Sequence, residues 1–398
     1  MSTSSTAAHS GGIMDKLHKF AFASSALYAV IIMLLAMPFV QRHALFQNAI
    51  RIPWGARFDM PEKYGLAPGK TMDFKLITPD NLTIGAWFVL SDPYYQEHRA
   101  SVFEQPTLED VHKALKSYPT VLYCHGAAAT RAAPTRIQAY SAITSRLKAN
   151  VFTVDYRGFG DSEGIPSAEG VIEDAKTAWR WLMEQGVKAD EVVIVGHSLG
   201  TAIATGLATA LAEENIKPRG VALLAPFTSL LALIETTTIQ GIPILQPLQS
   251  FAFGKRLLQW LLVPSFDTLA IIGEINVPIL IAHSQADMDI PHYHSRTLLD
   301  TLLDPHLPAA QALPDSPSIV PSDGEYRTYL EVQKERRTLR SQLVRKIEVP
   351  TFGTIEEFDG SAGKVVYVET FWGNHNEVGL QEGVQDLIAS TFRLGTHL

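Results

Sequence analysis

Cysteine is almost absent from this chain of 398 residues, and basic residues are outnumbered by acidic ones. The single cysteine, Cys124, excludes an intramolecular disulfide, so cysteine usage does not indicate a redox compartment. Lysine and arginine total 33 against 41 acidic residues, which gives a formal net charge of −8. Because no basic excess is present to neutralise phosphates, we do not expect nucleic acid as a partner. No internal repeat is evident, and the length suits one large domain or two small ones.

Charged side chains are also missing from residues 20–40. A helix of that length would span about 31 Å, close to the roughly 30 Å of a bilayer's hydrocarbon core. We therefore expect a transmembrane helix at 20–40, retained as an anchor because the apolar core of a signal peptide is normally only about 7–15 residues long. Residues 1–19 are expected to form a disordered tail. Basic residues lie on both sides of 20–40, so the positive-inside rule does not decide the orientation.

Strand and helix patterns alternate through most of the remaining chain, after two strands predicted at 72–78 and 83–90. Predicted strands follow at 120–124, 151–155, 192–195, 221–224, 278–283 and 365–369, with helices at 137–147, 168–184, 199–212, 295–303 and 378–392. Such alternation predicts an α/β fold with a mostly parallel, twisted sheet and helices on both faces.

Two segments interrupt this alternation. Residues 227–275 are apolar and punctuated by prolines, which is typical of a cap or lid over a site. Residues 304–360 form a longer insertion, in which 304–324 are rich in Pro, Ser and Asp and predict a loop. Residues 326–346 are dense in Arg, Lys and Glu, which favours a solvated surface helix.

The most informative motif is Gly-His-Ser-Leu-Gly at residues 196–200, directly after a β-branched run. A strand followed by Gly-x-Ser-x-Gly and an alanine-rich helix is the nucleophile-elbow pattern of α/β-hydrolases. The glycines leave room for a strained turn that presents one side chain, Ser198. Ser198 would stand at a helix N-terminus, where developing negative charge is stabilised. We therefore predict Ser198 as a catalytic nucleophile.

An activated serine needs a base and an orienting acid, which follow the serine in this chain order in α/β-hydrolases. Asp287 and Asp289 both come after the strand at 278–283, and either could instead be a turn residue that caps the next helix. We prefer Asp287 as the acid. His375 lies in the loop after the last strand, between two asparagines and before the closing helix, and we predict it as the base.

The oxyanion hole of such a site needs two preorganised backbone N–H groups. Leu199 supplies one, directly after the nucleophile. The small residues at 126–129, after the strand at 120–124, let the backbone approach the reacting oxygen, and we assign the second N–H to Ala127. This chemistry needs no metal and no organic cofactor.

Four blocks of the sequence carry a family resemblance: residues 125–131, 155–162, 196–201 and 225–229. Together with the N-terminal anchor, they resemble the membrane-anchored lysophosphatidylserine lipase and monoacylglycerol lipase branch of the α/β-hydrolase superfamily. The resemblance covers about 70–303 and resumes at 362–395. It implies Ser198 as nucleophile, Asp287 as acid and His375 as base. It further implies hydrolysis of lysophospholipid or monoacylglycerol esters, with the catalytic domain in the lumen of the endoplasmic reticulum.

We therefore expect residues 41–398 to form an α/β-hydrolase domain that acts as a membrane-anchored serine ester hydrolase on single-chain lipids, through an acyl-enzyme intermediate. One alternative is an acyl-protein or acyl-CoA thioesterase that uses the same residues. Another is a non-catalytic, membrane-anchored binding protein on this fold. Asn81-Leu82-Thr83 is a glycosylation sequon that matters only for a lumenal domain, and it can equally be a plain turn.

Overall fold

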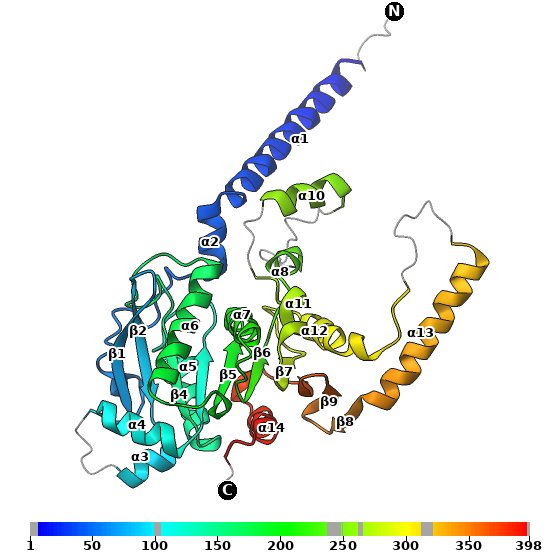
Figure 1. Ribbon diagram of the computed structural model, residues 1–398. Helices are drawn as coiled ribbons and strands as arrows, with labels where there is room; N and C mark the ends of the chain where they lie inside the picture. The colour runs from blue at the N-terminus through cyan, green and yellow to red at the C-terminus, as the bar shows by residue number, and fades with distance from the viewer. Residues whose placement is uncertain are drawn as a thin grey trace, which may run out of the picture. The chain divides into compact units, whose positions relative to one another are not determined.

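Ten strands form a single sheet within the part of the chain that the structure describes (Figure 1). The structure is a computed structural model, and it describes residues 7–98, 105–236, 248, 250–261, 266–311 and 321–395. The described chain divides into two compact units. One contains residues 1–45 and 244–264, and the other contains 46–243 and 265–398 with the whole sheet.

The central strands of the sheet are parallel, and the strands at both edges are antiparallel. In spatial order the strands are β1 Thr71–Ile77, β2 Thr83–Val89, β4 Asn150–Val154, β3 Thr120–Cys124, β5 Val192–His197, β6 Gly220–Leu224, β7 Ile279–Ser284, β10 Gly363–Thr370, β9 Gly353–Gly360 and β8 Arg345–Val349. The run from β4 to β10 is parallel throughout, so the prediction of a mostly parallel sheet is confirmed. The carboxyl ends of these strands meet at one edge, where ligand sites of such sheets lie.

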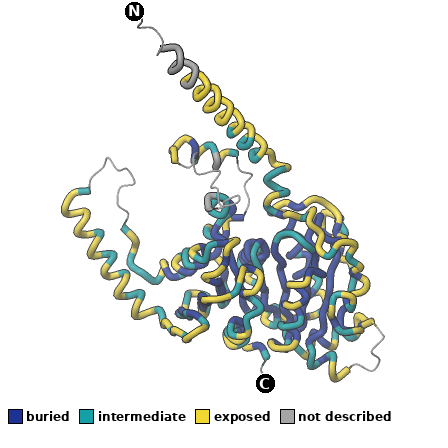
Figure 2. The backbone as a smooth tube through the Cα atoms, turned by 180° about the vertical axis from the view of Figure 1, so that it is seen from behind, coloured by how far each residue is buried: buried dark blue, intermediate teal, exposed yellow. Residues whose placement is uncertain are grey.

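Helices cover both faces of the sheet because successive strand residues point to opposite sides. In β4, Val151 joins the core beneath α5 Pro134–Arg146 and α14 Glu382–Phe392. The next residue, Phe152, instead packs against Trp181 of α6 Ala168–Glu184, with ring centroids 4.8 Å apart. Helix α7 Leu199–Glu213 packs beside α6 on that second face. Buried residues therefore fill the central strands and the helix faces that pack on them (Figure 2).

Further helices of this unit are α3 Asp92–His98, α4 Leu108–Ser117, α8 Leu230–Thr236, α11 Thr268–Ile271, α12 Tyr293–Leu303 and α13 Asp323–Leu343. Of these, α12 packs against β7, and α11 packs against α7. The predicted cap at 227–275 contributes α8, α11 and α10 Ala252–Leu261, while 237–247, 249 and 262–265 lie outside the described residues.

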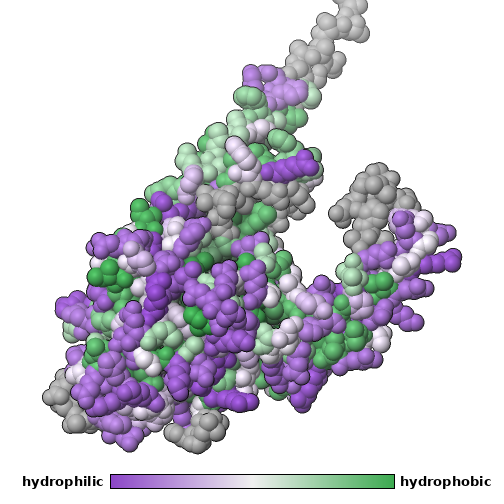
Figure 3. Space-filling model, in the orientation of Figure 1, coloured by the Kyte–Doolittle hydropathy of each residue, from purple (hydrophilic) through white to green (hydrophobic). Residues whose placement is uncertain are grey.

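The N-terminal helix α1 spans Ala7–Leu35, which corrects two expectations. Residues 7–19 are helical rather than disordered, because the helix of the apolar segment continues through them, with an Asp15–Lys19 pair one turn apart. The uncharged stretch 20–40 is not one helix, because α1 ends at Leu35 and α2 begins at Pro38. The ring of a proline makes the helical conformation unfavourable for the residue before it. The candidate membrane span is Met14–Leu35, with exposed apolar side chains (Figure 3).

The insertion at 304–360 also differs from expectation. The charged helix α13 occupies Asp323–Leu343, and Ser322 and Glu325 form a reciprocal capping box at its start. Residues 345–346, which we assigned to this helix, instead open β8. Strands β8 and β9 extend the sheet beyond β10, so the pairing partner, rather than local propensity, decides their conformation.

Candidate active site

Ser198 stands at the turn between β5 and α7, in backbone geometry that a side chain rarely adopts. Its φ is 53° and its ψ is −124°, a conformation that persists only when its surroundings enforce it. The Ser198 N–H donates to the Leu224 carbonyl at 2.9 Å, and the Thr201 hydroxyl donates to the Ser198 carbonyl at 2.6 Å. These bonds to β6 and to the first turn of α7 hold the strained residue in place.

Both flanking glycines are required by close backbone approach. A Cβ on Gly200 would collide with the Cys124 carbonyl of β3, and a Cβ on Gly196 would collide with the Gly200 carbonyl. The residue types of the Gly-x-Ser-x-Gly motif therefore follow from packing as well as from the turn. A Cβ on Gly126 would lie 3.1 Å from Cβ of Ser198, so the loop after β3 passes directly beside the serine.

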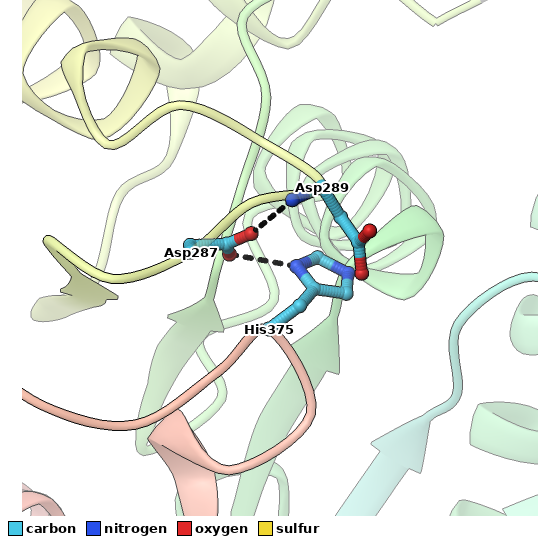
Figure 4. Close-up of side chains that lie close together, drawn as sticks. All are labelled: Asp287, Asp289 and His375. Carbon is cyan, nitrogen blue, oxygen red and sulfur yellow. Dashed lines mark hydrogen bonds and ion pairs between the residues drawn. The ribbon is translucent and has the colours of Figure 1, made fainter. Parts of the chain in front are cut away.

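Asp287 and His375 come together across two loops, the first after β7 and the second after β10 (Figure 4). Nδ1 of His375 lies 2.7 Å from Oδ2 of Asp287. The side chain of Asp287 is 1% exposed, whereas Asp289 is exposed. Between the two aspartates, it is Asp287 that contacts the histidine. The backbone N–H of Asp289 donates to Oδ1 of Asp287 at 2.8 Å, so Asp289 helps to hold its neighbour.

The Asp287 carboxyl is surrounded by donors. Burial acts to raise its pKa, but hydrogen bonds from His283 and His375 outweigh burial and hold the pKa well below its usual range. The Ile290 N–H donates to Oδ1 at 2.9 Å. Asp287 is therefore an ionised carboxylate at neutral pH, and it favours the His375 tautomer that carries its proton on Nδ1. Nε2 of His375 is then the atom able to accept a proton.

Carboxylate and imidazole atoms of Asp287, Asp289 and His375 lie within 4.8 Å of one another. Such a set could offer ligands to a metal ion. The hydrogen bond between Asp287 and His375 already accounts for the closeness of two of its members, and an exposed aspartate beside them is an ordinary surface group.

His283 is a neighbour of the site that the sequence analysis did not identify. Its Nε2 lies 3.1 Å from Oδ2 of Asp287 and 2.9 Å from the Ile290 carbonyl. Because a carbonyl can only accept, Nε2 carries the proton, and Nδ1 accepts from the Ser295 hydroxyl at 2.6 Å. The sequence offered no signal for this contact, since His283 lies in the buried strand β7 and Ser295 in α12.

His197, inside the elbow, supports the loop that carries His375. Nε2 of His197 donates to the His375 carbonyl at 2.9 Å, and the two ring centroids are 5.1 Å apart. Burial, with the adjacent His375, lowers the pKa of His197 to about 3, so its ring is neutral. A neutral donor that binds a main-chain oxygen is a structural support rather than a base.

The two residues predicted to supply the oxyanion hole lie at the start of α7 and in the loop after β3. Leu199 is the first residue of α7, and the first N–H groups of a helix have no partner within it. The N–H of Ala127 donates to no backbone acceptor among the described residues. The loop after β3 is conformationally unusual, with φ of 56° at Ala128 and 53° at Ala129.

The loop at 155–162 is held by ion pairs. Arg157 donates to Asp174 at 2.8 Å and to Asp80 at 2.7 Å. Arg131 binds Asp155 at 2.7 Å on the same side of the sheet. These contacts make the loop a structural element, as its charged residues among glycines predict.

The comparisons with known proteins agree with this architecture. The family model described as alpha/beta hydrolase fold matches residues 119–246, which include β3, the elbow and β6. An alpha-beta hydrolase from Vibrio vulnificus superposes with a TM-score of 0.53 at 16% identity, covering 89% of this chain and 94% of that one. At that identity the likeness concerns the fold alone.

Sequence relatives carry more specific names. Lysophosphatidylserine lipase ABHD12 of Danio rerio is 29% identical over 302 residues, which are 73% of this chain and 74% of that protein. The Bos taurus protein of the same name is 33% identical over 220 residues, 55% of this chain and 53% of its own length. Protein ABHD12B of Homo sapiens is 26% identical over 265 residues, 64% of this chain and 68% of that protein. The match thus spans about half of the bovine relative.

Proposed function

The chain is an α/β-hydrolase, and from that premise we propose that it is a serine ester hydrolase with Ser198 as nucleophile, His375 as base and Asp287 as orienting acid. The observation that carries the proposal is the 2.7 Å contact between Asp287 and His375. The His375 carbonyl is bound by His197 of the elbow, whose next residue, Ser198, is held at φ 53°. The two loops and the elbow lie at the carboxyl edge of the parallel strands, where sites of this fold are built.

The proposed reaction uses the available atoms in order. Oγ of Ser198 attacks the ester carbonyl carbon while Nε2 of His375 takes the hydroxyl proton. The carbonyl oxygen becomes an oxyanion that accepts hydrogen bonds from the N–H groups of Leu199 and Ala127. The tetrahedral intermediate collapses to an acyl-enzyme, and His375 gives its proton to the leaving alcohol. Water then repeats the cycle on the acyl group, and the buried carboxylate of Asp287 stabilises the imidazolium in each half.

We propose a single-chain lipid ester, a lysophospholipid or a monoacylglycerol, as the substrate. The relatives named lysophosphatidylserine lipase support the lysophospholipid, and apolar side chains on the loops that carry the acid and the base suit either lipid. Met288, directly after Asp287, is 92% exposed, and Trp372, three residues before His375, is 68% exposed. Exposed apolar groups beside a reaction centre suit contact with an acyl chain or a lipid surface.

We further propose that α1 anchors the chain in a membrane, with the catalytic domain in the lumen of the endoplasmic reticulum. The Met14–Leu35 span is long and apolar enough to cross a bilayer. Asn81 of the glycosylation sequon is exposed in the turn between β1 and β2, with φ of 61°. A glycan attached there would project into solvent without displacing the core.

A substrate panel tests the proposal. Full-length protein in mixed micelles is incubated with lysophosphatidylserine, a monoacylglycerol and a palmitoyl thioester, each with the same acyl chain, and fatty acid release is measured. We expect the two oxygen esters to be cleaved with the higher kcat/KM. Preference for the thioester would favour the thioesterase alternative, and no release from any substrate would support a binding protein.

A further inference from the structure

Arg136 collects the carbonyl oxygens of the loop that passes beside Ser198. This residue lies in the first turn of α5, and its side chain is buried. Its Nη2 donates to three successive carbonyl oxygens, those of Gly126 at 2.9 Å, Ala127 at 3.2 Å and Ala128 at 2.6 Å. One cation therefore orients the carbonyls of residues 126–128. We call residues 126–130 the oxyanion loop.

The N–H groups that follow are bound by a different segment, residues 46–52, which we call the brace. Three successive N–H groups donate to brace carbonyls: Ala128 to Phe46 at 2.9 Å, Ala129 to Ile50 at 2.6 Å and Thr130 to Ile52 at 3.1 Å. The oxyanion loop is thus tied through its carbonyls to α5 and through its later N–H groups to the brace.

The brace is itself fixed to the hydrolase unit. The ring of Phe46 is 3% exposed and meets the rings of Phe159 and Phe266 edge-on, with centroids 6.5 and 6.3 Å away. The side-chain amide of Asn48 donates to the Gly158 carbonyl at 3.0 Å. These contacts set the position of the brace carbonyls independently of the oxyanion loop.

The oxyanion loop needs contacts with other segments to hold its backbone conformation. Ala128 and Ala129 both have left-handed backbone conformations, which are unfavourable for residues that carry a Cβ. Such residues hold their conformation only when surrounding groups enforce it. The Ala127 N–H lies along the chain between the Gly126 carbonyl, which Arg136 binds, and the Ala128 N–H, which the brace binds. It has no backbone acceptor among the described residues.

We propose that Arg136 and the brace are positioning elements of the oxyanion hole, which together aim the Ala127 N–H at the oxyanion that develops on the substrate. The inference rests on the proposed serine-hydrolase function. It also gives the segment after the candidate membrane span a role in the site. The brace begins eleven residues after Leu35, so the chain that enters the hydrolase unit contacts the oxyanion loop first.

Arg136→Met tests the first half of the inference in the full-length protein. A misaligned N–H weakens the transition state more than the bound substrate, so we expect kcat to fall by about 10- to 100-fold while KM changes by less than about threefold. Affinity for a long-chain trifluoromethyl ketone, which forms a tetrahedral adduct with the serine, should fall by the same factor as kcat. Arg136→Lys should lose less, and millimolar guanidinium should partly restore Arg136→Met.

Lys70→Met is the matched control, because it also removes a buried cation. Lys70 binds Thr144 and Asp92 rather than the oxyanion loop or the brace. We expect this variant to lower the melting temperature without a comparable loss of kcat or of ketone affinity. If the Arg136 variants lose stability as Lys70→Met does, and keep the kcat and the ketone affinity of the wild type, the positioning role is wrong.

The brace is tested by inserting two glycines between Gln47 and Asn48, which shifts the later brace carbonyls relative to their donors. The control is the same insertion between Glu214 and Asn215, in the exposed turn after α7. We expect the first insertion to reduce kcat and ketone affinity together, and the second to change neither by more than about twofold. Equal effects of the two insertions would contradict a role of the brace in the site.

Measurements on the wild-type protein distinguish a failure of the proposed function from a failure of the positioning role. If it neither cleaves lipid esters nor binds the ketone, the proposed function fails and the positioning role fails with it. If the wild type does both and the Arg136 and brace variants resemble their controls, only the positioning role fails.

Discussion

His283 donates its Nε2–H to Oδ2 of Asp287 at 3.1 Å, and the same oxygen lies 2.7 Å from Nδ1 of His375. One carboxylate oxygen is therefore shared by two histidines. The Ile290 carbonyl and the Ser295 hydroxyl fix the tautomer of His283, so its ring is a preset donor. This arrangement keeps the carboxylate both ionised and immobile.

The first prediction concerns His283→Gln. A hydrogen bond to a charged group contributes roughly 1.5–3 kcal/mol, and its loss lets the pKa of Asp287 rise from its depressed position. Asp287 stays ionised at pH 7 in this variant, but it loses a donor that holds it against His375, and we therefore expect kcat/KM at pH 7 to fall by about tenfold. Its loss toward acid pH should begin at a higher pH than in the wild type. A pH profile of kcat/KM between 4 and 8 measures both effects, and an unchanged profile would contradict this role.

The second prediction compares the two aspartates. Asp287→Asn keeps the shape of the side chain but removes the charge that sets the His375 tautomer, and we expect kcat to fall by about 10³- to 10⁴-fold. Asp289→Asn keeps the backbone N–H that binds Asp287, so kcat should change by less than about threefold. Initial rates on one lipid ester measure both. Equal losses would show that the acid had been assigned to the wrong residue.

The third prediction concerns packing at the elbow. In Gly200→Ala the added methyl group meets the main-chain carbonyl of Cys124, which cannot move without displacing β3. We expect this variant to lose about 3 kcal/mol of stability or to fail to fold. Gly206→Ala is the control on the same helix, since its methyl group meets the end of the Ile172 side chain, which can rotate. Melting temperatures should therefore fall sharply for the first variant and little for the second.

The fourth prediction concerns acid stability. Burial acts to raise the pKa of Asp155, but the His125 ring, whose Nε2 lies 3.3 Å from Oδ1, and the Arg131 charge lower it to about 2. An aspartate in an unfolded chain titrates near 3.9, so this group stabilises the fold above about pH 4 and loses that contribution as the pH falls toward 2. We expect about 2 kcal/mol of unfolding free energy to be lost in this interval, and the pH dependence to be weaker in Asp155→Asn. Urea unfolding at pH 5, 4 and 3 measures the slope, and equal slopes would contradict the assignment.

The fifth prediction tests the proposed orientation. If the hydrolase unit is lumenal, Asn81 is accessible to the glycosylation machinery and lies in an exposed turn. We expect endoglycosidase H to increase the electrophoretic mobility of the protein expressed in a eukaryotic cell, and Asn81→Gln to remove that shift. Protease added to intact microsomes should leave the unit uncut. Cleavage by the protease, without a glycan on Asn81, would place the unit on the cytosolic side.

Sequence patterns predicted the central part of the fold because β-branched runs and helical periodicity agree with the tertiary structure there. The strands around β3, β4 and β5 lie within a residue or two of their expected bounds. Strands β8 and β9 were missed, because Arg345–Val349 is short and charged, and it becomes a strand only by pairing with its neighbour. The helical state of residues 7–19 was missed because composition alone suggested a tail.

The candidate site, like the fold, could be predicted from the sequence only in part. Chain order and motif spacing singled out Ser198, Asp287 and His375, and the structure brings the last two into contact; their catalytic roles stay predictions. His283 and Arg136 were not predicted, because each acts through neighbours that lie far away along the chain or through main-chain atoms. Side-chain contacts to backbone carbonyls leave no residue pattern that a single sequence could display.

The central claim is that Ser198 forms the acyl-enzyme, and the most direct measurement is mass spectrometry of the protein after rapid acid quench during turnover of a lysophospholipid. We predict an ester-linked acyl group on the peptide that contains Ser198, absent in Ser198→Ala, which should also fail to react with a fluorophosphonate. An acyl group on another residue, or turnover by Ser198→Ala at the wild-type rate, would contradict the account.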